Sequence, residues 1–595
     1  MMLKRKIGAK DQTPDEVEFM KAVSDLFDLL DIDANVRRFV FPVYINRLQS
    51  QHTTQGSICI REAVAVLSRG GLSTEEIKRM IFSLDKNEDG ALSKSEFAAF
   101  CKDIPISALT SRVKTLLGKK RVAIMGGTFA PPTDSHLLMA ANAIHLQLAD
   151  EVWITPTGKP RSGDVKLGKV TLTSRDRLVM CHLAVDTSFS GSFPIKVCDE
   201  EIEGDALSTP ELLRRLKKKH VNCHFSFLAG SNLCEKIPTW RCDSKDKNWW
   251  KDTEFIIFKR DAFDVPEDWA KSPNVTVADS GQSLLARRRK NLGQKPIPQA
   301  PTLSNMNSSV MKKRYQHKIT AGLLPFAVEN FMYRKQKLVQ CLQDAATKKT
   351  KRRVAIFGGS FNPITDGHLK MACEVLHSKK VDELWLVPCG KRPDKPSLKT
   401  PALNRYLMCQ LAVNSKLPMM NGGQDFAISV HDAELDAPKA YITPVLLRKL
   451  DKMYPEIEFC FVAGADLLEG MHTWGGDDQS LKGWELTRQM VVLPREGYEI
   501  PKNWKRTFLG FSLFFLSISF LTLLHDPDRN NIQIVEINVG RMVTSNHSSS
   551  KLRRLIGTGA DDIRKLVRSE KSLHCIEGLT PIGVISHIHR NNLFI

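Results

Sequence analysis

Short apolar runs, each followed by a turn signal and then a helical pattern, recur along most of the chain. Their positions are VAIMGG at 122–127, VWITP at 152–156, FSFLAG at 225–230, VAIFGG at 354–359, LWLVP at 384–388 and FCFVAG at 459–464. Runs of this length bounded by Gly or Pro are typical of strands buried on both faces. Their alternation with helical stretches predicts parallel sheets with helices on both sides. Ligands bind such sheets beyond the carboxyl ends of the strands, and the Gly-rich turns lie at those ends.

The apolar runs belong to a longer internal repeat. Five pairs of blocks keep one order: 119–140 with 351–372, 150–160 with 382–392, 175–185 with 404–413, 225–240 with 459–474, and 323–332 with 579–588. Self-similarity of this extent predicts two homologous domains in tandem, at 118–340 and 350–595.

Residues 1–105 carry a different pattern. DKNEDGALSKSE at 85–96 fits the calcium loop of an EF-hand between helical flanks. Its expected ligands are Asp85, Asn87, Asp89, Ala91 through its carbonyl, Ser93 and Glu96. QHTTQGSICIRE at 51–62 can be aligned as a second loop, but it has no carboxylate before Glu62. We therefore expect an all-α, EF-hand-like module that binds Ca²⁺ at one loop.

The net charge of +20 indicates an anionic partner, and charge alone does not choose among nucleotide, nucleic acid and membrane surface. Thirteen cysteines without a CxxC spacing favour a reducing compartment. The N-terminal MMLKRKIGAKDQ has no apolar core of a secretory signal. We expect a cytoplasmic protein. Basic clusters at both ends of 286–318 leave a nuclear location open, although a disordered basic insertion is the preferred interpretation.

Residues 507–524, TFLGFSLFFLSISFLTLL, carry no charge and are just long enough to span a bilayer. They fall inside the second predicted domain, where a span would put two halves of one site on opposite faces of a membrane. We interpret the apolar stretch near 507–532 as an insertion or a translated intron, and membrane association as the less favoured reading.

GGSFNPITDGHL at 358–369 carries the most specific chemistry. Gly358 and Gly359 allow close approach of the backbone after a strand, and the following helix presents free N–H groups to a phosphate. Thr365 and His368 lie three residues apart at the start of that helix, so both can face one phosphate.

This pattern resembles the nucleotidyltransferase superfamily with the motif H/T-x-G-H, and within it the nicotinate/nicotinamide mononucleotide adenylyltransferases. Further matches support the resemblance: PDK at 393–395, where Asp394 replaces a His, Arg405 with Met408, GAD at 464–466 with Trp474, VVLPREG at 491–497, and SSSKLR at 548–553. The resemblance covers nearly all of 351–595 and, more loosely, 119–340. Phosphopantetheine adenylyltransferases share T-x-G-H and are the second choice.

The resemblance implies transfer of the adenylyl group of ATP, with Mg²⁺, to a pyridine mononucleotide in NAD biosynthesis. His368 and Thr365 would be catalytic. The implied ATP and phosphate contacts are Gly358, Gly359, Ser360, Phe361, Ser549, Ser550 and Arg553. The implied mononucleotide contacts are Lys395, Arg405, Asp466 and Trp474. The predicted fold class is thus α/β, with two tandem doubly wound parallel-sheet nucleotidyltransferase domains after the EF-hand-like module.

The first repeat has lost part of this pattern. Ser135 replaces the Gly of T-x-G-H, Asn232 stands at the position of Asp466, and Ala286 falls on that of Arg553. We expect this repeat to be weak, altered in substrate or structural. A calcium-responsive nucleotide-binding scaffold without catalysis is the alternative from another class. No nucleic-acid partner is expected, and homo-oligomerisation stays open.

Overall fold

The computed structural model describes residues 57–59, 91–93, 119–146, 148–160, 165–167, 170–240, 248–260, 263–278, 324–347, 351–417, 427–468, 470–475, 478, 480, 489–493, 532–534 and 580–593. They fall into two compact units. The first unit comprises residues 1–165, 172–178 and 194–323, and the second comprises 166–171, 179–193 and 324–595.

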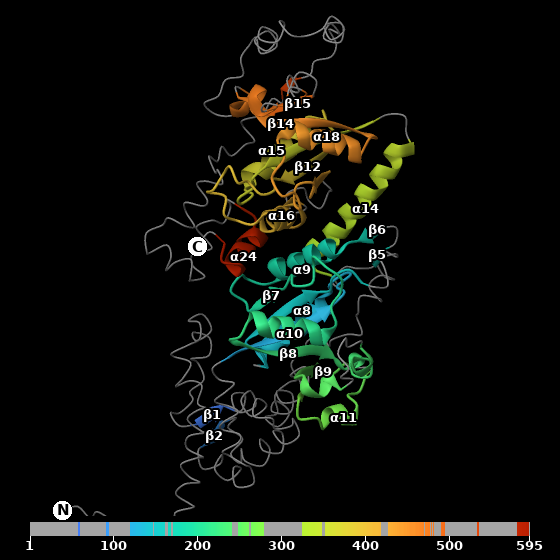
Figure 1. Cartoon of the computed structure of the whole chain (residues 1–595), viewed down its shortest axis with the longest axis vertical. Helices are drawn as coiled ribbons and strands as arrows, with labels where there is room; N and C mark the ends of the chain where they lie inside the picture. The colour runs from blue at the N-terminus through green and yellow to red at the C-terminus, as the bar shows by residue number, and fades with distance from the viewer. Residues whose placement is uncertain are drawn as a thin grey trace, which may run out of the picture. The chain divides into compact units, whose positions relative to one another are not determined.

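The first unit is built on a six-stranded sheet of order β10-β9-β8-β3-β4-β7 (Figure 1). Its strands are β3 Lys120–Gly127, β4 Glu151–Pro156, β7 Ile195–Val197, β8 Cys223–Gly230, β9 Phe255–Phe258 and β10 Val275–Ala278. All neighbouring strands in it are parallel. Between these strands along the chain lie the helices α8 Asp134–His145, α9 Ser174–Ser188, α10 Thr209–Lys219 and α11 Glu267–Ala270, with the short turns η2 Ser231–Leu233, η3 Ile237–Thr239 and η4 Trp249–Asp252. Residues 179–188 of α9 belong to the second unit. A small pair, β5 Val165–Leu167 and β6 Val170–Leu172, precedes α9, and its residues 166–171 belong to the second unit.

The second unit holds a sheet of order β13-β12-β11-β14-β15-β16, also parallel throughout. Its strands are β11 Arg352–Gly359, β12 Glu383–Pro388, β13 Ile428–Val430, β14 Ile457–Gly464, β15 Met490–Leu493 and β16 Ile532–Ile534. Its helices are α14 Phe326–Thr347, α15 Asp366–His377, α16 Ala402–Leu411 continued by the π-helical η5 Ala412–Lys416, α18 Thr443–Met453, η6 Ala465–Leu467, η7 Met471–Gly475 and α24 Ile582–Arg590. Read from the opposite edge, its strand order matches that of the first sheet. The predicted parallel α/β architecture is confirmed for both sheets.

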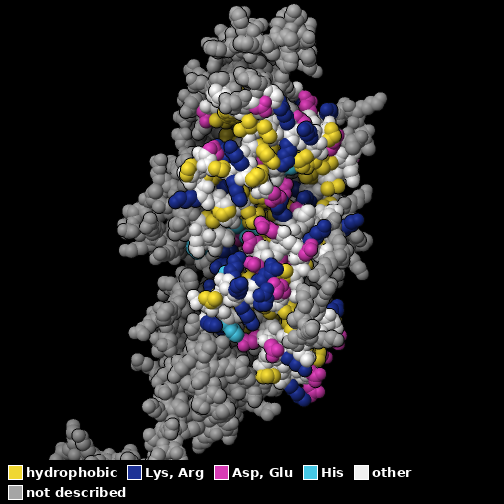
Figure 2. Space-filling model, in the orientation of Figure 1, with side chains coloured by type: hydrophobic (Ala, Val, Ile, Leu, Met, Phe, Trp, Pro, Cys, Tyr) yellow, Lys and Arg dark blue, Asp and Glu magenta, His cyan; other side chains and the backbone are white. Residues whose placement is uncertain are grey.

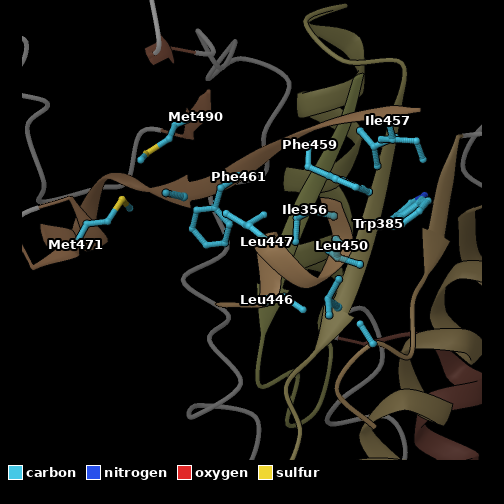
Figure 3. Packing of buried hydrophobic residues seen from close by; sticks show 14 of the residues in the cluster. Ile356, Trp385, Leu446, Leu447, Leu450, Ile457, Phe459, Phe461, Met471 and Met490 are labelled. Carbon is cyan, nitrogen blue, oxygen red and sulfur yellow. The ribbon is translucent and has the colours of Figure 1, made fainter. Parts of the chain in front are cut away.

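The core of the second unit explains why its apolar runs are continuous. Figure 3 shows Ile356, Trp385, Phe459 and Phe461 of the sheet packed against Leu446, Leu447 and Leu450 of α18. Leu338 and Leu342 of α14 pack against the same cluster. The predicted domain boundary at residue 340 therefore falls inside a helix that contributes to this core.

A buried polar cluster ties residues 179–193 to α24 within the second unit. His587 Nδ1 lies 2.9 Å and His182 Nδ1 3.2 Å from one carboxylate oxygen of Asp186, and Arg590 Nε donates to the other oxygen at 2.8 Å. Burial would raise the pKa of Asp186, but these partners hold it far below its usual value. Burial lowers the pKa of His587, which favours the neutral imidazole.

The described surface carries mixed charge. On the face shown in Figure 2, Lys and Arg side chains are interspersed with Asp and Glu and are densest over α10. There Glu211 pairs with Arg214 and Arg215, as on an ordinary solvated helix. Among the helices that the structure describes, none combines the length and apolar character needed to cross a membrane.

Several predicted features lie outside the described residues. These are the apolar stretch at 507–524, the basic segment 286–318, and most of the EF-hand-like module. Of that module the structure describes one antiparallel pair, β1 Ser57–Cys59 with β2 Ala91–Ser93, in which Ile58 stands opposite Leu92.

Candidate active site

The helix α15 begins at a cap made by Thr365 and His368. The Thr365 hydroxyl accepts from the backbone N–H of His368 at 3.4 Å, and His368 Nδ1 accepts from the backbone N–H of Thr365 at 3.1 Å. The same Nδ1 lies 2.7 Å from the Thr365 hydroxyl oxygen. Because an N–H can bond only to an unprotonated ring nitrogen, this contact assigns the neutral tautomer with hydrogen on Nε2. His368 therefore offers an N–H donor at the positive end of a helix.

The turn before this cap is held in a strained shape. Phe361 has a φ of 42°, an uncommon conformation for a bulky residue, and its ring meets that of His368 edge to face at 5.2 Å. A Cβ on Gly359 would lie 3.0 Å from the Phe361 ring, whereas one on Gly358 would have ordinary contacts at 3.8 Å. Of the two glycines, Gly359 lies in the tighter space, because a side chain there would press on the Phe361 ring that supports His368.

Arg405 in α16 is buried beneath this turn. Its guanidinium donates to the carbonyls of Ser360 at 3.0 Å, Gly390 at 2.9 Å and Thr400 at 3.3 Å. These bonds join the loop after β11 to the loop after β12. The role of Arg405 as a mononucleotide ligand stays a prediction, and the contacts seen here are those of a residue that positions both loops.

Glu434 is a second loop-positioning residue, and sequence reasoning missed it. Its buried carboxylate accepts from the backbone N–H groups of Gly390 at 3.0 Å and Tyr441 at 3.1 Å. Burial raises the pKa of the Glu434 carboxyl above its usual value, although the two hydrogen bonds and the charges of Arg392 and Arg405 act in the opposite direction. Its partners are backbone N–H groups, one of them 44 residues away, and backbone groups leave no residue pattern that indicates this role.

The PDK segment lies on the surface. Lys395 is exposed, and Asp394 pairs with Arg392 through contacts of 2.6–3.1 Å. These contacts hold the pKa of Asp394 down to about 2. The Asp that replaces the expected His thus forms a local ion pair beside Lys395.

Asp466 and Trp474 follow β14, the strand beside β11. Asp466 is half-buried in η6, and a Cβ on Gly464 would lie 2.5 Å from its Oδ1, so the glycine makes room for the carboxylate. The Trp474 ring is partly buried and packs edge to face on Phe461 at 6.0 Å. Because adjacent parallel strands end at one edge, the structure brings Asp466 to the same edge of the sheet as Gly359 and His368. Ser549, Ser550, Arg553 and the calcium ligands Asp85, Asn87, Asp89 and Glu96 lie outside the described residues, and only the backbone of Ala91 and Ser93 is described.

The first unit has equivalents of the Thr365–His368 cap and of the buried arginine that joins two loops, Arg405. His136 Nδ1 accepts from the Thr133 N–H at 3.0 Å and lies 2.7 Å from its hydroxyl, and Phe129 has a φ of 44°. Arg177 donates to the carbonyls of Thr128 at 3.0 Å and Gly158 at 2.7 Å. Burial, followed by the charge of Arg260, lowers the pKa of His136 to about 4, so this imidazole is neutral at pH 7.

A parallel sheet whose Gly-rich turn leads into a Thr- and His-capped helix is the architecture of a nucleotidyltransferase. A family model described as cytidylyltransferase-like matches residues 356–554. Curated relatives named "Probable nicotinate-nucleotide adenylyltransferase" include that of Bacillus licheniformis, 31% identical over 171 residues, which are 29% of this chain and 84% of the relative. That of Leifsonia xyli is 35% identical over 154 residues, 26% of this chain and 70% of the relative. The chain belongs to the nicotinate-nucleotide adenylyltransferase family.

Solved structures similar to the chain include the Plasmodium falciparum nicotinic acid mononucleotide adenylyltransferase complexed with NaAD. It is 20% identical, with a TM-score of 0.31, and the match covers 41% of this chain and 97% of that one.

Proposed function

We propose that the chain transfers the adenylyl group of ATP to nicotinate or nicotinamide mononucleotide, releasing pyrophosphate and the dinucleotide for NAD biosynthesis. A phosphate oxygen of the mononucleotide attacks the α-phosphorus of ATP, and the bond from that phosphorus to the pyrophosphate oxygen breaks. The observation that carries the proposal is the Nε2–H of His368, fixed by the Thr365 N–H on Nδ1, at the N-terminus of α15. A fixed donor at a phosphate stabilises charge that develops during transfer.

The chain's own residues would bind and orient the two substrates. The turn of Gly358, Gly359, Ser360 and Phe361 would receive the ATP phosphates, with Ser549, Ser550 and Arg553 as further phosphate contacts. Asp466 would accept from ribose hydroxyls, and Trp474 would face the pyridine ring. Lys395 would hold the phosphate side of the mononucleotide. Arg405 and Glu434 would keep the loops between these groups in place.

Mg²⁺ would arrive with ATP and neutralise phosphate charge during transfer. Among the described residues, the one group of three His, Cys, Asp or Glu side chains close enough to share a metal is His182, Asp186 and His587, and all three are buried. Mg²⁺ generally binds substrate phosphates and water rather than a dedicated protein cage.

We infer that residues 118–340 and 350–595 arose by tandem duplication. The inference is supported by the matching strand orders and by the positive φ at both Phe129 and Phe361. It is also supported by the buried arginines Arg177 and Arg405, which donate to loop carbonyls in the same way. The second copy keeps the intact motif and is the proposed catalytic copy.

We also propose that residues 1–105 form a calcium-binding EF-hand-like module. When 51–62 and 85–96 are aligned as loops of twelve residues, the pairing of Ile58 with Leu92 sets the eighth position of one loop opposite the eighth of the other. Such a symmetric register is expected of two paired loops and supports the proposal.

The direct test offers ATP and Mg²⁺ to the full chain with nicotinate mononucleotide, nicotinamide mononucleotide or pantetheine phosphate in separate reactions. The proposal expects equal amounts of dinucleotide and pyrophosphate with a pyridine mononucleotide. Product only with pantetheine phosphate would assign the other adenylyltransferase reaction, and ATP binding without product would favour the scaffold.

A further inference from the structure

The helix α24 is buried between two segments of the second unit. It packs against α16 and η5 (Figure 1), and also against residues 179–193, which belong to this unit although the first repeat supplies them. A Cβ on Gly583 of α24 would lie 3.3 Å from Thr187 Cγ2 and 3.4 Å from Leu411 Cδ2, so the helix lies close to both neighbours. Close-packed contacts of this kind transmit a displacement instead of absorbing it.

The carboxyl-terminal end of α24 is anchored by the buried guanidinium of Arg590. Its Nε donates to Asp186 Oδ1 at 2.8 Å, and its Nη atoms donate to the carbonyls of Phe193 at 2.7 Å and Ser190 at 2.8 Å. His587 Nδ1 lies 2.9 Å from the other carboxylate oxygen of Asp186. Removing one partner of a buried ion pair leaves an uncompensated charge and is strongly destabilising. Asp186, a residue of the first repeat, therefore holds this end of the helix in place.

The start of α24 is joined to the Thr365–His368 cap. The buried Thr580 hydroxyl donates to the carbonyl of Ile364 at 2.7 Å. That carbonyl and the N–H of Thr365 form one planar peptide group, and this N–H donates to His368 Nδ1 at 3.1 Å. The bond from Thr580 thus orients the peptide group that keeps the hydrogen of His368 on Nε2. A hydrogen bond to the carbonyl also polarises the N–H of the same group.

The first repeat lacks this link. Leu324 stands at the position of Thr580 and has no hydroxyl to donate. The Thr133 N–H nevertheless bonds to His136 Nδ1 at 3.0 Å, so the cap forms without the link. What Thr580 adds in the second repeat is a fixed connection between the cap and α24.

We propose that α24 positions the peptide group behind His368 and that the first repeat supplies the anchor of this helix, Asp186. Thr580 and Arg590 are then positioning residues at the two ends of one buried helix, and they act through His368. The inference rests on the proposed adenylyl transfer. It gives the first repeat a part in the reaction of the second, although the first repeat's own motif has diverged.

Two substitutions in the full chain test the two ends of α24. Thr580→Val removes the hydroxyl and keeps the branched shape, and Asp186→Asn installs the residue that the second repeat has at the equivalent position, Asn414. Each should lower kcat about 3–10-fold, the net effect of one hydrogen bond, and leave the Kd of ATP unchanged, since a donor at developing charge acts on the transition state.

Asp176→Asn is the matched control. It makes the same change in the first turn of α9, where the carboxylate accepts from the Thr173 N–H at 3.0 Å, and it also installs the second repeat's residue, Asn404. It should leave kcat unchanged. All rates are measured well below the melting temperature of each variant. Normal kcat in Thr580→Val or in Asp186→Asn would overturn the inference and leave the cluster around Asp186 a structural one.

The double variant tests whether Asp186 acts through Thr580. If it does, the two falls in kcat do not add, and the double variant resembles the more affected single variant, whereas the losses of melting temperature add. Falls in kcat that multiply would overturn the route through α24.

Hydrogen exchange followed by mass spectrometry gives a readout that does not depend on the reaction. Both single variants should speed exchange in residues 362–369 and leave the protection of α18 unchanged, because the opening is local. Unchanged exchange at 362–369, or equal acceleration in α18, would overturn the inference. A wild-type chain that makes no dinucleotide would refute the proposed function, and the exchange rates would still decide whether α24 positions the cap.

Discussion

Replacing His368 by Ala tests the central geometry. The change removes the Nε2–H aimed from the start of α15 and the Nδ1 that accepts from the Thr365 N–H at 3.1 Å. The first loss acts on the reaction, where a fixed donor at developing charge contributes about 2.7–4 kcal/mol, or ~10²–10³ in turnover. The second acts on stability, because a backbone N–H without its partner costs about 1–3 kcal/mol.

The first copy supplies a control with the same local structure. His136→Ala loses an equivalent pair of contacts, 3.0 Å from the Thr133 N–H and 2.7 Å from the Thr133 hydroxyl. It should therefore cost similar stability but leave the transfer rate unchanged.

The assay measures kcat by pyrophosphate release, the affinity for ATP by titration, and the melting temperature of each variant. For His368→Ala we expect turnover to fall far more than ATP affinity, at temperatures well below melting. Near-normal turnover would refute the role of His368. Loss of activity in His136→Ala with activity kept in His368→Ala would show that the copies are assigned in reverse.

Three other predictions concern the loops, the core and the N-terminal module. Arg405→Lys should lower kcat/KM about 10–100-fold, because one ammonium cannot donate to the three carbonyls that the guanidinium contacts. Arg177→Lys, the equivalent change in the first copy, should leave kcat/KM unchanged, and steady-state kinetics compare the two variants. Burial lowers the pKa of His431 in the folded chain to about 4, whereas a His in the unfolded chain has a pKa of about 6.5. The unfolded chain therefore binds more protons between these values, and the free energy of unfolding decreases as the pH falls, by about 2 kcal/mol from pH 7 to pH 5. His431→Phe should flatten this pH dependence in denaturant titrations, and an unchanged dependence would contradict the prediction. Calorimetry should find one calcium site with a Kd of about 10⁻⁷–10⁻⁵ M, and Glu96→Gln should remove it. A chain that binds no calcium would refute the proposal that residues 1–105 form a calcium-binding EF-hand-like module.

Local pattern was sufficient to predict the parallel sheets, because buried strands must be apolar on both faces and the turn residues between them are Gly and Pro. The spacing of Thr365 and His368 predicted that both can face one phosphate, since residues three apart at a helix start share one face. Their contact with each other was found only in the structure. Both features depend on neighbours in the chain.

Contacts between distant backbone groups could not be predicted in this way. Glu434 and Arg405 position the loops by bonding to carbonyls and N–H groups that every residue carries, so their partners have no signature in the sequence. Packing also decided that α14, which begins inside the predicted first domain, contributes Leu338 and Leu342 to the second core. The burial of the Arg260 side chain is likewise a property of the fold, because the sequence does not show which basic residue becomes buried.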